Sequence, residues 1–183
     1  LAQVHPDFTW TPKMASQFKR LRDRGFATPK VYWSLLSLGL RSKAANELTA
    51  LLKFPRAWVM CHEDSRKLSL LVDSFNDPDL KASILCTNLD KYRVEAVQTC
   101  WAWSNSAIIS ERLISYLEEL RQIRPILDGD ELQALGLANG SNIRKIEARL
   151  RGARIDGEIV TRTDEVDLAR RLANVIGPPD DWL

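Results

Sequence analysis

The amino-acid sequence predicts an all-α protein, a compact multi-helix bundle that forms one or two helical subdomains. Start and stop signals for helices recur along the chain, and the apolar residues between them fall at helical spacing. The one strand-like stretch, residues 157–162, is short, and no repeat of about 20–50 residues is visible. The short connections favour packing between antiparallel neighbours.

The first half of the chain contains five expected helices. Thr11-Pro12 and Thr28-Pro29 each place a capping residue before a proline at the first helical position, and Gly25 stops the first helix. Met14, Phe18 and Leu21 fall on one face of that helix, and Asp77-Pro78 signals the fifth start. The expected ranges are 12–24, 29–38, 43–54, 55–75 and 77–86.

The second half contains five more expected helices, and the chain ends in a proline-containing tail. Ser106 opens the second of them, and the last begins after Thr163. The expected helices cover about 90–103, 107–123, 129–135, 141–154 and the segment after 163. We therefore divide the sequence into a helical body, a C-terminal region with a basic helix, and a tail, at residues 1–124, 125–176 and 177–183.

Composition limits the classes of function. The 183 residues are 45% hydrophobic and 27% charged, with a net charge of +2, so the chain as a whole is no polycation. Cys61, Cys86 and Cys100 are odd in number and lack CxxC spacing, which argues against a disulfide framework or zinc and favours the cytoplasm. The longest apolar stretch is too short to span a bilayer, so we expect no membrane partner. The chain begins at Leu1 rather than methionine, as a fragment of a longer protein would.

The segment 136–158 carries the main candidate site. Gly136, Asn139 and Gly140 tolerate positive φ, and Ser141 or Asn142 can cap the helix that follows. The N–H groups of its first turn form an anion site, while Ile143, Ile146, Leu150 and Ala153 form its buried stripe. The predicted RNA-binding residues are Gly140, Ser141, Asn142, Arg144, Lys145, Arg149, Arg151 and Arg154. The alternative is an ordinary cap with a solvated face.

Other candidate features have structural interpretations. The first helix is basic through Lys13, Lys19, Arg20, Arg22 and Arg24; we expect a solvated face, with Arg20 and Arg24 as additional RNA candidates. Asp128 and Asp130 could bind magnesium but are expected to cap a helix, and residues 62–66 (HEDSR) are expected to form a surface salt-bridge row. We expect the helical tryptophans in the core, and the sequence contains no nucleophilic triad.

The order of segments resembles the body and tail of bacterial tRNA nucleotidyltransferases (CCA-adding enzymes) and the related poly(A) polymerases. "LAQVHPDFTWTPKMASQFKRL" is similar to the stretch after the neck of that family, and residues 127–165 are similar to its C-terminal pattern. The matching residues are Gly129, Leu132, Gly136, Gly140, Leu150, Asp156, Gly157 and Glu158. The motifs of the family's catalytic head are absent from this sequence.

The resemblance implies a C-terminal region that docks tRNA or another structured RNA, so that its 3′ end reaches a separate N-terminal catalytic head. This chain alone is then not expected to be catalytic, to bind metal or to need a cofactor. A parent with the head would be a nucleotidyltransferase that uses ATP and CTP with magnesium. Two other interpretations remain: a helix–hairpin–helix-like module that binds duplex DNA, and a structural or oligomerising helical domain.

Overall fold

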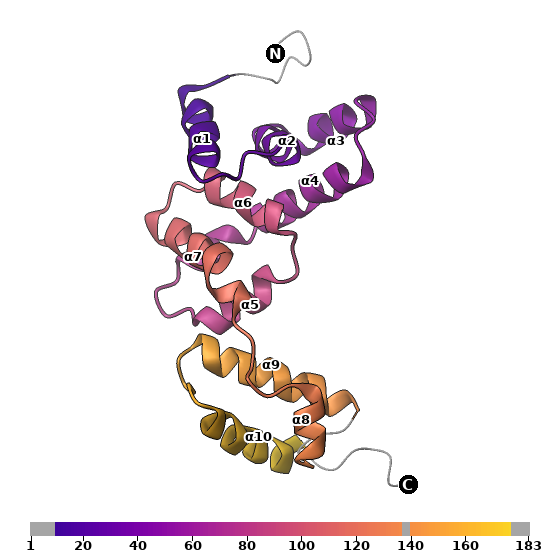
Figure 1. Cartoon of the computed structure of the whole chain (residues 1–183). Coiled ribbons are helices and arrows are strands. Elements are labelled where there is room, and N and C mark those ends of the chain that lie inside the picture. Colours follow the sequence, from indigo (N-terminus) through magenta and orange to yellow (C-terminus); the bar gives the residue numbers. More distant parts are fainter. Residues whose placement is uncertain (1–9, 137–139, 177–183) are drawn as a thin grey trace. The chain divides into compact units, whose positions relative to one another are not determined.

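The computed structural model describes residues 10–136 and 140–176, without the side chains of Ser141 and Ile176, and it is all-α as the sequence predicts (Figure 1). No helix in these ranges is long and apolar enough to cross a membrane. The described helices are α1 (Pro12–Asp23), α2 (Pro29–Leu38), α3 (Ser42–Leu51), α4 (Arg56–Ser69), η1 (Val72–Asn76), α5 (Ala82–Leu89), α6 (Val94–Trp103), α7 (Ala107–Glu118), η2 (Leu120–Gln122), α8 (Gly129–Ala134), α9 (Ser141–Ile155) and α10 (Arg162–Ile176), where η denotes a 3₁₀ helix.

The chain forms two compact units. The first contains residues 1–80 and 88–118, and the second contains residues 81–87 and 119–183. The sequence-based ranges 1–124 and 125–176 rest on motifs, whereas these units rest on packing. Packing assigns residues 81–87 to the second unit because the start of α5 is bonded to the end of α9, as described below.

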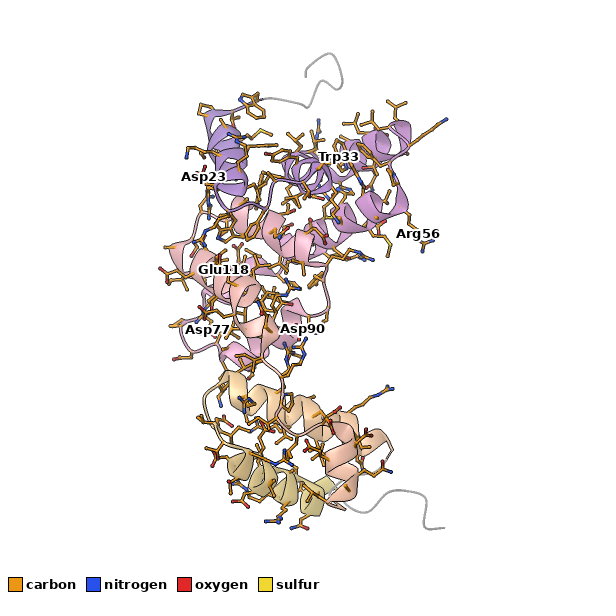
Figure 2. The ribbon with its side chains drawn as sticks, viewed as in Figure 1. Asp23, Trp33, Arg56, Asp77, Asp90 and Glu118 are labelled. Atoms are coloured by element: carbon orange, nitrogen blue, oxygen red, sulfur yellow. The ribbon has the colours of Figure 1, made fainter. Side chains whose placement is uncertain are left out.

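The core of the first unit lies where α2, α4 and α6 pack against one another. Leu35, Leu68 and Val97, one from each helix, are fully or almost fully buried there. Of the helical tryptophans expected in the core, Trp33 and Trp101 are buried, whereas Trp58 and Trp103 are only half-buried. The stick view in Figure 2 shows Trp33 on its helix. Thr11 accepts a hydrogen bond from the Met14 amide at 3.2 Å, so the predicted cap of α1 is confirmed.

The predicted helix 55–75 is wrong in its last third, because α4 ends at Ser69. The amides of Leu70 and Leu71 bond three residues back, to Lys67 and Leu68, and the chain then forms η1. Residues three apart in a 3₁₀ helix project from the same side, so Val72 and Phe75 are both buried. Tertiary packing therefore determines this change of helix type.

The predicted start of the fifth helix at Asp77-Pro78 is also wrong. Asp77 forms a turn by accepting from the Asp79 amide, and α5 begins at Ala82. Asp156, which follows α9, accepts from the amide of Ser83 at 2.8 Å and from its hydroxyl at 2.6 Å. A carboxylate distant in sequence therefore caps α5, and no local pattern could predict that start.

The second unit packs α8, α9 and α10 around an apolar core (Figure 1). Ile146, Leu150 and Ala153 of α9 are fully buried, as the predicted stripe requires, while its fourth member, Ile143, is half-buried and packs against the same core. Gly157 ends α9 with φ +71°, and the amides of Gly157 and Glu158 bond back to Arg154 and Ala153. These two bonds form a Schellman motif, which satisfies carbonyls at the end of the helix.

Residues 62–66 are not the surface salt-bridge row that the sequence predicts. His62 and Ser65 are buried, and the Arg66 guanidinium donates to the carbonyl oxygens of Ser37 and Leu40. Asp64 pairs with Arg93 at 2.5 Å. The segment instead joins α4 to its neighbours, because its polar side chains find partners on other elements.

Acidification is expected to destabilise the first unit through His62. Burial, with a smaller contribution from the charge of Arg66 and against that of Glu63, holds the pKa of His62 below its ordinary 6.5. The unfolded chain therefore takes up the proton first, and the free energy of unfolding falls as the pH drops through about 6.5 toward the lower pKa of the folded protein. Urea unfolding followed by tryptophan fluorescence should show this slope, and His62→Gln should flatten it. A slope that persists in His62→Gln and disappears in His5→Gln would assign the effect to His5 and contradict this prediction.

Candidate nucleic-acid interface

The glycine turn before α9 has the backbone that the sequence predicts at two of its positions. Gly136 has φ +67° and Gly140 has φ +51°, values that side-chain-bearing residues rarely adopt. Asn139 lies outside the described residues. The predicted side-chain cap by Ser141 or Asn142 is wrong, because Gly140 itself is the N-cap and no side chain bonds there. A glycine cap leaves first-turn N–H groups to be satisfied by water or a ligand.

Two predicted RNA-binding cations are exposed at the start of α9. The side chains of Arg144 and Lys145 have no hydrogen-bond or ion-pair partner in residues 10–136 and 140–176. As consecutive residues of an α-helix they project about 100° apart, so they present two directions of charge. Both lie off the buried stripe of α9. Asn142, one turn earlier, is half-buried.

The other three predicted cations have partners within the second unit. Arg149 pairs with Glu158 at 3.2 Å, and Arg151 Nε donates to the Ile123 carbonyl at 2.9 Å. Arg154 donates to Glu165, which is completely buried, at 2.9 Å. Arg149 is exposed and its pair can exchange for a phosphate, but Arg154 neutralises a buried carboxylate. The five predicted cations therefore differ in how accessible they are to a ligand.

Glu158 links the basic helix to a residue that the sequence analysis did not select. Its carboxylate accepts from Lys81 Nζ at 2.9 Å as well as from Arg149. The bond to Lys81 keeps the pKa of Glu158 below and that of Lys81 above the ordinary values. Lys81 therefore belongs to the same charged surface as Arg149. Lys81 and Arg149 come together at Glu158 only in the folded chain, so no sequence pattern indicated Lys81.

The additional candidates on α1 are bound within the first unit. Arg20 donates to the carbonyl of Ser104 at 2.9 Å and lies over the Trp101 ring, 4.5 Å from its centroid. Burial lowers the pKa of the Arg20 guanidinium. Arg24 pairs with Glu118 at 2.5 Å. The expectation of a wholly solvated basic face is therefore wrong for Arg20, which contacts the core.

Asp128 caps α8, which confirms the predicted cap. Its carboxylate accepts from the Glu131 amide at 2.9 Å, and the Glu131 carboxylate accepts from the Asp128 amide at 3.2 Å. The pair forms a capping box. Across residues 10–136 and 140–176, no three His, Cys, Asp or Glu side chains are grouped so that they could hold a metal ion.

Most residues that carry the family resemblance stabilise the fold of the second unit. Leu132 and Leu150 are completely buried, Asp156 caps α5, and Gly157 closes the Schellman motif. A Cβ at Gly129 would lie 3.0 Å from the Ile143 side chain, so a larger residue would crowd α8 against α9. These residues therefore shape the unit that displays Arg144 and Lys145.

Comparison with known proteins gives one partial similarity. The chain is 42% identical over 59 residues to the A-adding tRNA nucleotidyltransferase of Geobacter sulfurreducens. The match covers 32% of this chain and 7% of that protein. No family model matches the chain, and no solved structure matches it. The similarity weakly supports a relationship to tRNA nucleotidyltransferases.

Proposed function

We propose that this chain docks tRNA or another structured RNA through the cationic start of α9. The observation that carries the proposal is that Arg144 and Lys145 are exposed, without partners in the described residues, directly after the Gly140 turn. Cations beside helix N–H donors are suited to phosphate groups. The partial similarity to a tRNA nucleotidyltransferase supports RNA as the source of those phosphates.

The arrangement favours recognition of the RNA backbone. A-form helices have a deep, narrow major groove, so proteins bind them mainly through phosphate and 2′-hydroxyl contacts. Arg149 lies one turn after Lys145, and a phosphate can replace Glu158 as its partner. Ser141 and Asn142 contribute backbone amides, while Arg151 and Arg154 hold the unit together and add charge. In a longer parent, a separate head would use ATP or CTP with magnesium to extend the bound RNA.

Replacing the two exposed cations together is expected to weaken tRNA binding. Arg144→Ala/Lys145→Ala should raise the Kd about 10-fold or more and lower the slope of log K against log salt by about 1–2, because two counterion-releasing contacts are lost. The measurement is a fluorescence-anisotropy titration of labelled tRNA at about 50 and 200 mM salt. Thermal unfolding of the variant should match that of the parent.

A charge-matched control separates a local contact from general attraction. Arg170→Ala/Arg171→Ala removes two cations from the exposed side of α10 and should leave the Kd within about twofold. Equal losses in both double variants would contradict a site on α9. Binding of a length-matched DNA duplex at least as tight as that of tRNA would favour the DNA-binding module, and no binding to either would favour a structural domain.

A further inference from the structure

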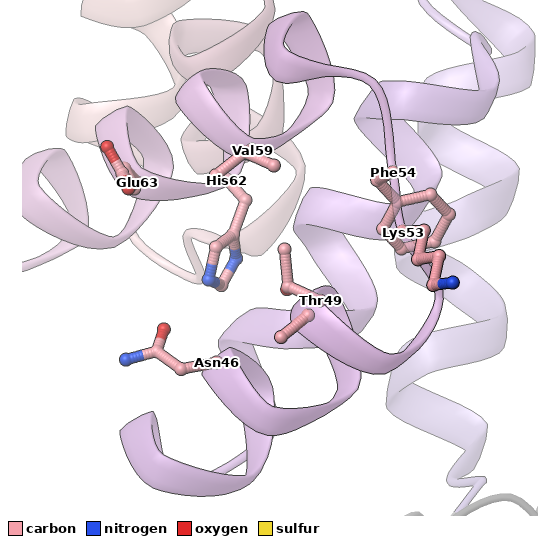
Figure 3. A pocket seen from close by; sticks show the side chains of 8 residues that line it. Asn46, Thr49, Lys53, Phe54, Val59, His62 and Glu63 are labelled. Carbon is pink, nitrogen blue, oxygen red and sulfur yellow. The ribbon is translucent and has the colours of Figure 1, made fainter.

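A pocket of about 380 Å³ opens between α3 and α4 in the first unit (Figure 3). His62 reaches from α4 toward Asn46 and Thr49 of α3, and Val59 is part of the wall. His62 is only 1% exposed, so its imidazole belongs to the inner wall rather than to the rim. The proposed docking of RNA by the second unit does not involve this pocket.

The hydrogen bonds of Ser37 fix which nitrogen of His62 carries the proton. Ser37 Oγ donates its single hydrogen to the Ser34 carbonyl at 2.7 Å. The same Oγ lies 2.7 Å from His62 Nδ1, so a hydroxyl that donates to Ser34 leaves Nδ1 to act as the donor in that contact. Nε2 therefore bears a lone pair whenever the imidazole is neutral. Burial lowers the pKa of His62, which keeps it neutral at physiological pH.

His62 Nε2 is an acceptor that the fold leaves unused. It is buried and has no hydrogen-bond partner among the described residues. A buried polar atom without a partner is energetically unfavourable, so such atoms are uncommon in native proteins. Nε2 is closed to water in the free protein, so an N–H donor has to displace part of the pocket wall to reach it, and the new bond would then remove this cost.

The remaining walls restrict the shape of a ligand. Thr49 Oγ1 donates to the Ala45 carbonyl at 2.7 Å, so it faces any ligand as an acceptor. The exposed Asn46 carboxamide offers one acceptor and two donors. Phe54 is stacked on Trp58, with ring centroids 4.9 Å apart, and has a tilted contact with Trp33 at 4.8 Å, so these neighbours already occupy much of its ring surface. Hydrogen bonding therefore has to orient the ligand.

We propose that this pocket binds a small neutral ligand through an NH₂ group conjugated to a neighbouring acceptor, the unit shared by primary carboxamides and amino-substituted heteroaromatic rings. One N–H donates to His62 Nε2, and the other donates to Asn46 Oδ1. The Asn46 NH₂ group donates in return to the adjoining oxygen or ring nitrogen. A carboxamide paired edge to edge with Asn46 satisfies both partners, as does an aminopyrimidine edge.

The test uses two pairs of probes, each with an NH₂ group in one member and an N(CH₃)₂ group in the other. Benzamide and 2-aminopyrimidine carry the NH₂ group, whereas N,N-dimethylbenzamide and 2-(dimethylamino)pyrimidine lack both hydrogens. Titrations are followed by NMR through the side-chain amide of Asn46 and the indole N–H of Trp33. At least one NH₂ probe should bind with a Kd of about 1–10 mM, and its dimethyl partner should bind at least about tenfold more weakly. The relative affinities show which ring class the pocket prefers.

Protein variants place the binding in this pocket. Asn46→Ala changes an exposed side chain and should weaken the NH₂ probe about fivefold or more, while Glu47→Ala, on the adjacent exposed residue, should not. The nitrogen shifts of His62 should show Nδ1 protonated in the free protein, and Nε2 should respond to the NH₂ probe. Equal binding of a probe and its dimethyl partner, unchanged binding by Asn46→Ala, or a His62 Nε2 already bonded to the Trp33 indole would each overturn the proposal.

Discussion

Glu165→Ala is expected to lower the free energy of unfolding of the second unit by about 3–5 kcal/mol, because it removes one partner of a buried ion pair. The Glu165 carboxylate is fully buried and accepts from the amides of Ile126 and Leu127, all at 2.9 Å. Arg154 donates to the same carboxylate at 2.9 Å. Without Glu165, the two amides lose their acceptor, and the partly exposed Arg154 guanidinium loses its ion partner and keeps only the Val160 carbonyl.

The measurement is urea unfolding followed by far-ultraviolet circular dichroism, with hydrogen exchange at the Ile126 and Leu127 amides. Both amides should lose protection in Glu165→Ala. Glu165→Gln keeps an acceptor oxygen but loses the charge, so its free energy of unfolding should lie between those of the parent protein and Glu165→Ala. The control Asp167→Ala, on the exposed side of the same helix, should change stability by less than about 0.5 kcal/mol. A loss below about 1 kcal/mol in Glu165→Ala would contradict the proposed role of the carboxylate.

Arg20→Ala is expected to destabilise the first unit by about 2–3 kcal/mol. The Arg20 guanidinium donates to the Ala102 and Ser104 carbonyls at the end of α6, and to the Ser110 hydroxyl at 3.2 Å. It also lies over the Trp101 ring. Alanine would remove the cation–π contact and the donors for carbonyls that no intrahelical amide satisfies.

Two further variants distinguish this role from general charge. Arg20→Lys keeps the charge but loses the planar fork, so it should recover only part of the stability. Arg22→Ala removes an exposed cation two residues away, which has no partner in the described part of the chain, and should be nearly neutral. Tryptophan fluorescence during urea unfolding measures all three variants. Equal midpoints for Arg20→Ala and Arg22→Ala would exclude the structural role.

The sequence predicts the fold better than it predicts the site, and the reason is the range of the interactions. Caps such as Thr11 and Asp128 act within three residues, so local patterns identify them. The start of α5 and the partner of Arg154 depend on residues that approach only in the folded chain. Arg144 and Arg154 look alike in sequence, yet one is exposed and the other binds a buried carboxylate. Only packing separates them.

The resemblance to a family pattern has the same limit. Leu150, Asp156 and Gly157 match the pattern because the second unit needs a buried leucine, a cap for α5 and a positive φ. Such a match predicts the shape of a unit. It does not select the side chains that contact a ligand, because those lie on the solvent side, where packing does not constrain the residue type.

The cap of α5 by Asp156 also sets an order of events during synthesis. Ser83 precedes its capping carboxylate by 73 residues. At about 5–20 residues per second, a ribosome needs about 4–15 seconds to cover that distance. Until then the first turn of α5 has no partner for the bonds it will make to Asp156, so the second unit completes its fold only after α9 has been made. A nascent chain stalled before residue 156 would therefore leave residues 81–87 without their capping carboxylate.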